Sequence, residues 1–210
     1  MKGMKKRWYH TLRHIKRARS GAVVMMALLA VVSAAIIMDR SMMSANYTAL
    51  LAVIAKGESR GNYNAYFGNA NNSMIDFTRM KLSEVLLWQR EFVESGQPSN
   101  AVGKYQFIRP TLEGLVAEMH IDTNELFDGE LQDRLAIRLI ERRGLRDFLR
   151  GRITREQFAH NLSKEWAALP RVIGDNPSMS YYAGDGLNKA HIGVPEILAA
   201  IESLRYSPSI

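Results

Sequence analysis

The chain of 210 residues contains no cysteine. It therefore cannot form a disulfide framework or use a thiol nucleophile, and it lacks the commonest ligand of zinc sites. Its histidines show no spacing that is typical of metal ligands, so we expect neither a metal site nor a cofactor. These five histidines are His10, His14, His120, His160 and His191.

Acidic residues are absent from the first 20 positions, which hold eight lysines and arginines. The formal net charge of +7 describes this basic tail, because the other residues hold 20 basic and 21 acidic side chains. We therefore expect no nucleic-acid binding by the folded domain. A basic arm that contacts nucleic acid is the alternative for residues 1–20.

Charges are also absent from Gly21 to Met38, an apolar run of 18 residues. A helix of this length spans about 27 Å, close to the hydrocarbon thickness of a bilayer. The positive charges before it predict a cytoplasmic N-terminus, with residues 21–38 as a transmembrane signal anchor in the inner membrane and the rest of the chain in the periplasm. The alternative is a signal peptide cleaved after the small residues Ser33-Ala34-Ala35.

The rest of the sequence predicts a linker over residues 39–46 and one domain over residues 47–210. Its periodicity indicates a mainly α domain with at most a small β-sheet. Asn46 is a candidate N-cap for a helix that ends near Glu58, and residues 61–73 predict an irregular loop. Further helices are expected over residues 82–93, 110–119, about 131–143 and after Pro195.

A capping box is expected at Thr154-x-x-Gln157, where a helix should begin. Its inward stripe would consist of Phe158, Leu162, Trp166 and Leu169. Trp166 on such a stripe indicates core packing, and stacking on a sugar ring is the alternative interpretation.

Three short motifs follow one another along this domain: Lys56-Gly57-Glu58-Ser59-Arg60, then Gly103-Lys104-Tyr105-Gln106 with Pro110-Thr111, and finally Ser180-Tyr181-Tyr182-Ala183-Gly184. In this order they resemble the signatures of the lysozyme-like lytic transglycosylases, over roughly residues 47–205. Gly103–Gln106 and Trp166–Pro170 more narrowly resemble the lambda-phage endolysin branch. The resemblance implies an α+β lysozyme-like fold and an enzyme that cleaves the β-1,4 bond between N-acetylmuramic acid and N-acetylglucosamine in peptidoglycan glycan strands.

Glu58 is the candidate catalytic acid. Cleavage of a glycosidic bond requires protonation of the leaving oxygen, and a carboxyl group does this at neutral pH if burial raises its pKa. Apolar neighbours such as Ile54, Tyr105 and Phe107 would provide that burial. Taken without the other motifs, Glu58 would instead indicate a solvated glutamate at a helix end.

The other motif residues are candidates for substrate binding or support. Gln106 would bind the acetamido group of the substrate or orient Glu58. The resemblance assigns Tyr181 to a hydrogen bond with the catalytic glutamate, whereas Tyr182 replaces the usual asparagine of the family. Tyr105 would stack on a sugar, and Ser59 would support Glu58.

The reaction type depends on a second carboxylate. Hydrolytic glycosidases use two, and Asp76 is the candidate here, although it equally suits a helix cap. The lytic transglycosylases need one acid and form 1,6-anhydro-N-acetylmuramic acid. We therefore expect a membrane-anchored lytic transglycosylase that serves phage lysis or entry, or bacterial wall remodelling or secretion. A hydrolase on the same fold, or an inactive carbohydrate-binding or structural membrane protein, is the alternative.

Overall fold

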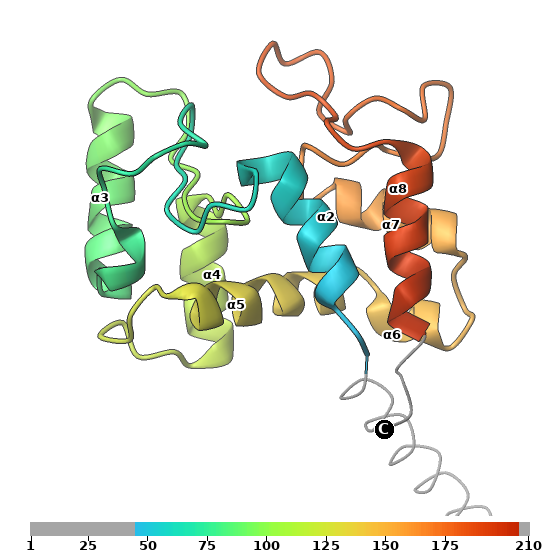
Figure 1. Ribbon diagram of the computed structural model, residues 1–210, viewed down its shortest axis with the longest axis horizontal. Coiled ribbons are helices and arrows are strands. Elements are labelled where there is room, and N and C mark those ends of the chain that lie inside the picture. Colours follow the sequence, from blue (N-terminus) through green and yellow to red (C-terminus); the bar gives the residue numbers. More distant parts are fainter. Residues whose placement is uncertain (1–44, 206–210) are drawn as a thin grey trace, which may run out of the picture. The chain divides into compact units, whose positions relative to one another are not determined.

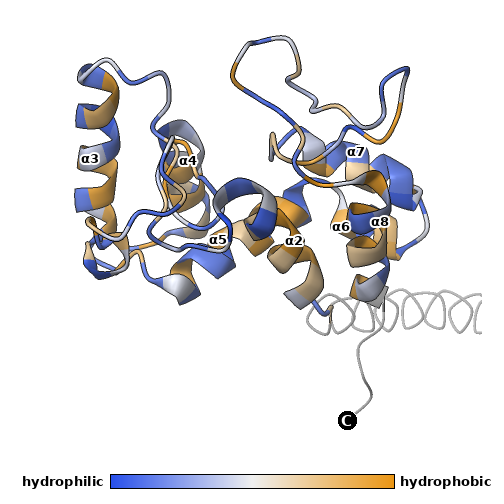
Figure 2. Ribbon diagram, turned by 45° about the horizontal axis from the view of Figure 1, so that its top comes forward, coloured by the Kyte–Doolittle hydropathy of each residue, from blue (hydrophilic) through white to orange (hydrophobic). Residues whose placement is uncertain are grey.

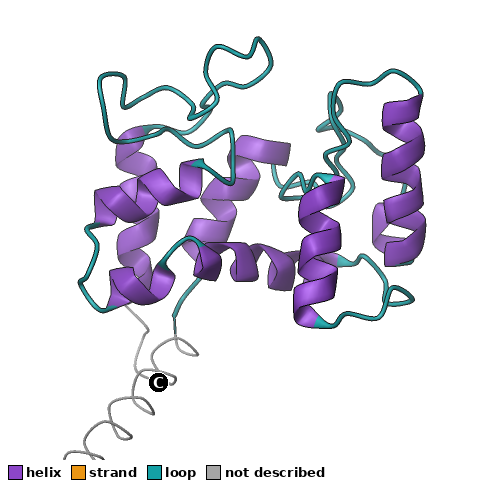
Figure 3. Ribbon diagram, turned by 180° about the vertical axis from the view of Figure 1, so that it is seen from behind, coloured by secondary structure: helices purple, strands orange, loops and turns teal. Residues whose placement is uncertain are grey.

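The structure, a computed structural model, describes residues 45–205. These residues form seven α-helices and two 3-10 helices (Figure 1). The elements are α2 (Thr48–Ser59), η1 (Phe77–Arg79), α3 (Leu82–Glu94), α4 (Arg109–Met119), α5 (Gly129–Arg142), α6 (Leu145–Leu149), α7 (Arg155–Ser163), α8 (Val194–Glu202) and η2 (Ser203–Arg205). The expected mainly α class is confirmed. Over this range the chain forms isolated β-bridges in place of a sheet (Figure 3).

Helix α2 is the central helix of this domain. It packs against α8 and α5, and its Leu50 and Ile54 are fully buried. The facing α8 contributes Ile197 and Ile201, which are also fully buried, and both helices are largely hydrophobic (Figure 2). Each such side chain contributes roughly 2 kcal/mol on burial, so this contact fixes the position of the last turn of α2.

The other helices lie on two sides of α2. Helices α3 and α4 pair on one side, whereas α6, α7 and α8 pack together on the other (Figures 1 and 3). Helix α5 packs against both α2 and α6.

Side-chain caps define several helix starts. The expected capping box is confirmed, because the Gln157 N–H donates to Thr154 Oγ1 at 3.1 Å and the Thr154 N–H donates to Gln157 Oε1 at 2.7 Å. At α2 the cap position is Tyr47, one residue later than expected. Asn46 still accepts the Thr48 N–H through its side-chain oxygen at 3.1 Å.

Helix α7 is shorter than its apolar stripe predicts. It ends at Ser163, so Trp166 and Leu169 lie in the following loop, where both are buried. The loop turns there because the Trp166 indole N–H donates to the carbonyl oxygen of Tyr105, at 3.3 Å. The expectation of one long helical stripe was therefore wrong, whereas the expectation that Trp166 belongs to the core is confirmed.

Within residues 45–205, no helix is long and apolar enough to cross a membrane. The basic tail, the expected anchor over residues 21–38 and the linker as far as residue 44 lie outside the described residues.

The turn at Gly103 has two requirements that glycine meets. Its φ is +82°, a left-handed conformation that side chains disfavour. A Cβ atom there would also lie 2.5 Å from Gln132 Oε1 and 3.0 Å from Phe127 Cε1. Both of these neighbouring side chains are fully buried, so neither can move aside without disturbing the core.

We expect Gly103→Ala to lower the free energy of unfolding much more than Gly96→Ala does. Gly96 has a similar φ of +95° but no described heavy atom within 4 Å of its Cβ position. Gly96→Ala should cost about 1 kcal/mol for the backbone conformation alone, and Gly103→Ala roughly 2 kcal/mol more for the clash. Urea unfolding of both variants measures the difference, and equal losses would contradict this account.

Candidate active site

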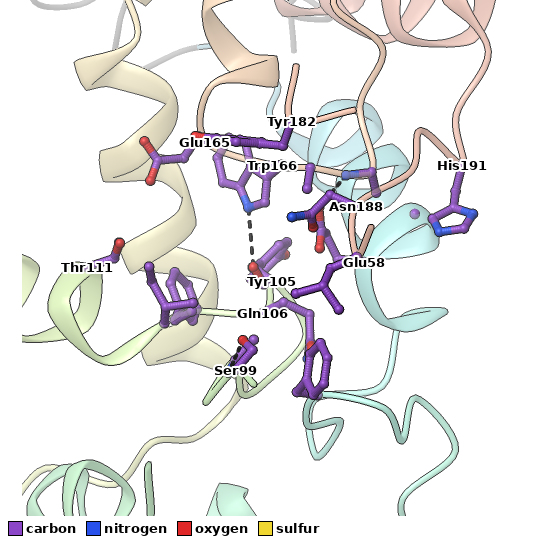
Figure 4. Close-up of a pocket in the computed structure, with 18 of the residues that line it drawn as sticks. Glu58, Ser99, Tyr105, Gln106, Thr111, Glu165, Trp166, Tyr182, Asn188 and His191 are labelled. Carbon is purple, nitrogen blue, oxygen red and sulfur yellow. Dashed lines mark hydrogen bonds between the residues drawn. The ribbon is translucent and has the colours of Figure 1, made fainter. Parts of the chain in front are cut away.

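A cleft of about 620 Å³ brings together segments that are far apart in the sequence (Figure 4). It is lined by the end of α2, by residues between Pro98 and Thr111, by Leu139 and Arg143, by the loop of residues 164–168, and by residues between Tyr182 and His191. Phe67 and Gly68 complete the lining.

Glu58 lies in this cleft on the last turn of α2 and is partly buried. The backbone N–H of Ala168 donates a hydrogen bond to Glu58 Oε1 at 3.0 Å. Burial raises the pKa of Glu58 from 4.5 to about 7, and the Ala168 hydrogen bond opposes that rise only in part. A carboxyl group with this pKa holds its proton in a large fraction of the molecules at neutral pH.

Gly57 allows the Ala168 loop to approach Glu58. A Cβ atom at position 57 would lie 2.9 Å from the Ala168 Cβ atom and 3.0 Å from Ile192 Cγ1. The backbone N–H groups of His191 and Ile192 in turn donate to the Ala168 carbonyl oxygen, at 2.8 and 3.2 Å. Glycine at position 57 thus permits the contact that buries Glu58. The sequence offered Gly57 only as part of a motif.

Ser59 supports the neighbouring turn from within the core. It is fully buried, and its hydroxyl donates to the Lys104 carbonyl oxygen at 2.7 Å and contacts that of Ala55 at 3.3 Å. The N–H of Lys104 donates to Gln132 Oε1 at 2.8 Å. The peptide groups on both sides of Lys104 are therefore held, which fixes the Gly103–Gln106 turn beside the end of α2.

Gln106 lies in the cleft, at the end of this turn, with a φ of +50°. Its side-chain amide donates to the Gly103 carbonyl oxygen at 2.8 Å. In the described part of the chain, this bond uses one N–H of the amide and no hydrogen bond joins Gln106 to Glu58. Binding of the substrate's acetamido group by Gln106 stays a prediction.

Tyr105 and Trp166 border the cleft but are almost completely buried, with 1% and 3% exposure. The Tyr105 hydroxyl donates to Asp133 Oδ1 at 2.7 Å, and burial together with this carboxylate raises its pKa. Such enclosed rings offer little surface to a sugar, so this geometry gives both residues a role in shaping the wall of the cleft.

The two tyrosines of the third motif differ in position. Tyr182 lines the cleft, and its hydroxyl donates to the Lys164 carbonyl oxygen at 2.7 Å. Tyr181 packs against the rings of His160 and Tyr182, with centroids 5.8 and 5.2 Å away. Among the residues that the structure describes, Tyr181 is not part of the cleft lining, so the expected pairing of Tyr181 with Glu58 is not formed here.

Asp76 also lies outside the cleft lining. It is exposed at the N-cap position of η1, where it accepts a hydrogen bond from the Thr78 hydroxyl and pairs with Arg79 at 3.3 Å. The Thr78 hydrogen bond is the main reason why the pKa of Asp76 lies below its usual value. Asp76 thus holds the N-cap position without a capping hydrogen bond from its side chain, and its carboxylate instead binds the side chains of Thr78 and Arg79.

Glu165 is the second carboxylate that does line the cleft. Its side chain is 12% exposed, and it accepts a hydrogen bond from Arg143 Nε at 2.7 Å. Sequence reasoning missed this pair, because 22 residues separate the two partners. The only available signal was the position of Glu165 next to the Trp166–Pro170 motif.

Within residues 45–205, no group of three or more histidine, aspartate or glutamate side chains is placed so that it could hold a metal ion. The cleft offers one carboxyl group with a raised pKa, one ion-paired carboxylate, two lysine ammonium groups and several amide groups.

Comparison with known proteins identifies the class of protein to which this site belongs. The sequence model of the Endolysin family matches residues 48–183, well over half of the chain, so the chain belongs to this family of peptidoglycan-degrading enzymes. The matched range contains Glu58, the Gly103–Gln106 turn and the Ala168 loop. No curated protein and no solved structure matches the chain.

The raised pKa of Glu58 predicts a pH-dependent cost to folding. Below the ordinary value of 4.5 both states are protonated, and as the pH rises towards about 7 the unfolded chain ionises first. Glu58 therefore destabilises the folded protein increasingly through this window, by up to roughly 3 kcal/mol.

We expect Glu58→Gln to become more stable than the wild type as the pH rises from about 4 to about 8. Urea unfolding at several pH values measures this difference. Glu91→Gln is the matched control, because Glu91 is exposed on α3. A stability difference between Glu58→Gln and the wild type that does not change with pH would contradict the raised pKa.

Proposed function

We propose that this protein is a lytic transglycosylase with a lysozyme-like domain, and that Glu58 is its catalytic acid. The observation that carries the proposal is the pKa of Glu58, which burial raises to about 7 in a cleft large enough for sugar rings. Membership of the Endolysin family supports peptidoglycan as the substrate.

In this mechanism Glu58 first acts as an acid and then as a base. Because Oε1 accepts the Ala168 N–H, Oε2 is the oxygen that carries the transferable proton. The proton passes to the glycosidic oxygen, and the bond from that oxygen to C1 of the muramic acid breaks while the sugar's own acetamido oxygen attacks C1. The carboxylate then removes the proton from the O6 hydroxyl, and O6 displaces the acetamido oxygen. The product is a 1,6-anhydro ring.

Transglycosylation is favoured over hydrolysis because neither candidate for the second carboxylate is free to activate water in the described cleft. Asp76 is exposed outside the cleft lining, and Glu165 is engaged by Arg143. A hydrolase would need one of them to activate water. An inactive binding protein is the third alternative, but binding alone gives no reason to bury Glu58 at the cost of its raised pKa.

We expect the wild-type protein to release muropeptides that end in 1,6-anhydro-N-acetylmuramic acid, one water lighter than hydrolytic products. Glu58→Gln should lower this release at least about a hundredfold, because it keeps the shape of the side chain and removes only the proton. Mass spectrometry of the products from purified sacculi measures both results.

Two variants separate the alternatives. Asp76→Asn should retain most activity and the same products, because only exposed contacts with Thr78 and Arg79 outside the cleft lining change. Glu165→Gln should keep the anhydro products even if the loss of its ion pair slows the reaction. Reducing-end products from the wild type, combined with a severe loss in Glu165→Gln, would establish a hydrolase in which Glu165 activates water.

We also propose, from the sequence of residues 21–38, that the domain is delivered across the inner membrane on an uncleaved anchor. The full chain should then fractionate with the inner membrane, with protease access to the domain only from the periplasmic side. A soluble mature form that begins after Ala35 would instead support a cleaved signal peptide. Phage lysis, virion entry and bacterial wall remodelling or secretion are all compatible with this delivery.

A further inference from the structure

The charges around the cleft do not balance. Its described lining contains the cations Arg143, Lys164 and Lys189 and the carboxylates Glu58 and Glu165. Arg143 is neutralised by Glu165, and a large fraction of Glu58 is protonated at neutral pH because its pKa is about 7. Two lysines therefore give the cleft a positive charge that its own acids do not compensate.

These two lysines come from segments that adjoin one another. Lys164 follows the last residue of α7, and its carbonyl oxygen accepts the hydroxyl of Tyr182 at 2.7 Å, which connects it to the segment that carries Lys189. The Lys164 ammonium lies 5.7 Å from the centre of the Tyr181 ring. Neither lysine forms a salt bridge with another residue of the described chain, whereas Lys56 and Lys104 both do.

In a strand that carries its stem peptides, the glycan offers these ammonium groups no anionic partner. The lactyl carboxyl group of each muramic acid is then bound in an amide, so the sugars are uncharged and the carboxylates belong to the stem peptides. A glycan seated with its scissile bond at Glu58 carries a stem peptide on the sugar next to that bond. Lys189 is exposed and Lys164 is half-buried, and both line the cleft without a salt bridge in the described chain, so both are suited to pair with such carboxylates.

We propose that Lys164 and Lys189 form a subsite for the carboxylates of the stem peptide, so that the enzyme binds peptide-bearing strands in preference to bare glycan. This inference rests on the proposed function, because it takes the glycan cleft as given. It assigns Lys164 and Lys189 to substrate selection and gives them no part in proton transfer.

The test measures binding to glycan oligomers that carry stem peptides and to the same oligomers after an amidase has removed the peptides. The lactyl carboxyl groups that the amidase frees are converted to uncharged amides, so that the bare oligomers carry no negative charge. All proteins carry Glu58→Gln, so that no strand is cleaved during the measurement. Adding Lys164→Gln and Lys189→Gln should weaken binding of the peptide-bearing oligomers about five- to tenfold and leave binding of the bare oligomers within about twofold. Raised salt should reduce the difference.

The matched control adds Arg146→Gln and Arg150→Gln, which remove two exposed positive charges from the α6 segment, outside the cleft lining. If the control weakens binding of the peptide-bearing oligomers as much as the lysine variant does, the effect is a general attraction to a polyanion and the proposed subsite is wrong. The subsite is also overturned if the lysine variant binds both oligomers as before, or weakens both equally. Thermal unfolding excludes misfolding as the cause.

Turnover separates this inference from the proposed function. The proteins with Glu58 restored are compared by kcat/KM on the peptide-bearing oligomers. Cleavage by the wild type tests the proposed function, whereas selective weakening of binding in the lysine variant tests the subsite. Suppose that the wild type does not cleave, but that adding the two lysine substitutions to Glu58→Gln still weakens binding of the peptide-bearing oligomers alone. This result would refute the proposed enzymatic activity and support the peptide subsite.

Discussion

The contact between the last turn of α2 and the Ala168 loop determines the properties of the cleft. It forms because Gly57 has no side chain, and a Cβ atom there would meet Ala168 at 2.9 Å. The contact shields the Glu58 carboxyl group from solvent and aims the Ala168 N–H at Oε1. The environment of the Glu58 acid thus depends on Ala168, a residue 110 positions away in the sequence.

Two opposing effects act on that acid. Burial favours the neutral form of Glu58, and the Ala168 hydrogen bond favours the charged form. Because burial is the larger effect, the carboxyl group keeps its proton near neutral pH, yet the hydrogen bond limits the cost when the proton leaves. This balance suits a group that must donate a proton and later accept one. The same burial destabilises the folded protein above neutral pH, so the chemistry is obtained at the expense of stability.

Much of the fold could be predicted from the sequence because its determinants are local. The capping box of Thr154 and the end of α2 near Glu58 each depend on a few neighbouring residues. The boundaries of α3 and α4 came within a residue of those expected for the same reason. The end of α7 did not, because a hydrogen bond from Trp166 to Tyr105, 61 residues away, overrides the helical period.

The site was less predictable than the fold. Motifs indicated Glu58, Ser59 and Gln106, and all three lie at the end of α2 or in the turn held against it. Which further carboxylate lines the cleft depends on tertiary packing. Asp76 carries no local signal of its position, and Glu165 carries only its place next to the Trp166–Pro170 motif. The choice between Tyr181 and Tyr182 likewise depends on how one loop turns, and here Tyr182 reaches the cleft.

The two walls of the cleft are held in different ways, and this suits their different tasks. The wall at the end of α2 is fixed by two hydrogen bonds to the Lys104 peptide groups: the Ser59 hydroxyl donates to the Lys104 carbonyl oxygen, and the Lys104 N–H donates to Gln132 Oε1. Proton transfer requires such precision, since reacting atoms must lie within hydrogen-bond distance. The opposite wall, around Leu187 and Lys189, is an exposed loop whose side chains reach solvent. Contacts to a variable, charged peptide need less precision and more access. A fixed acid beside an open loop that carries Lys189 therefore fits the proposed substrate, whose glycan is uniform and whose peptides are not.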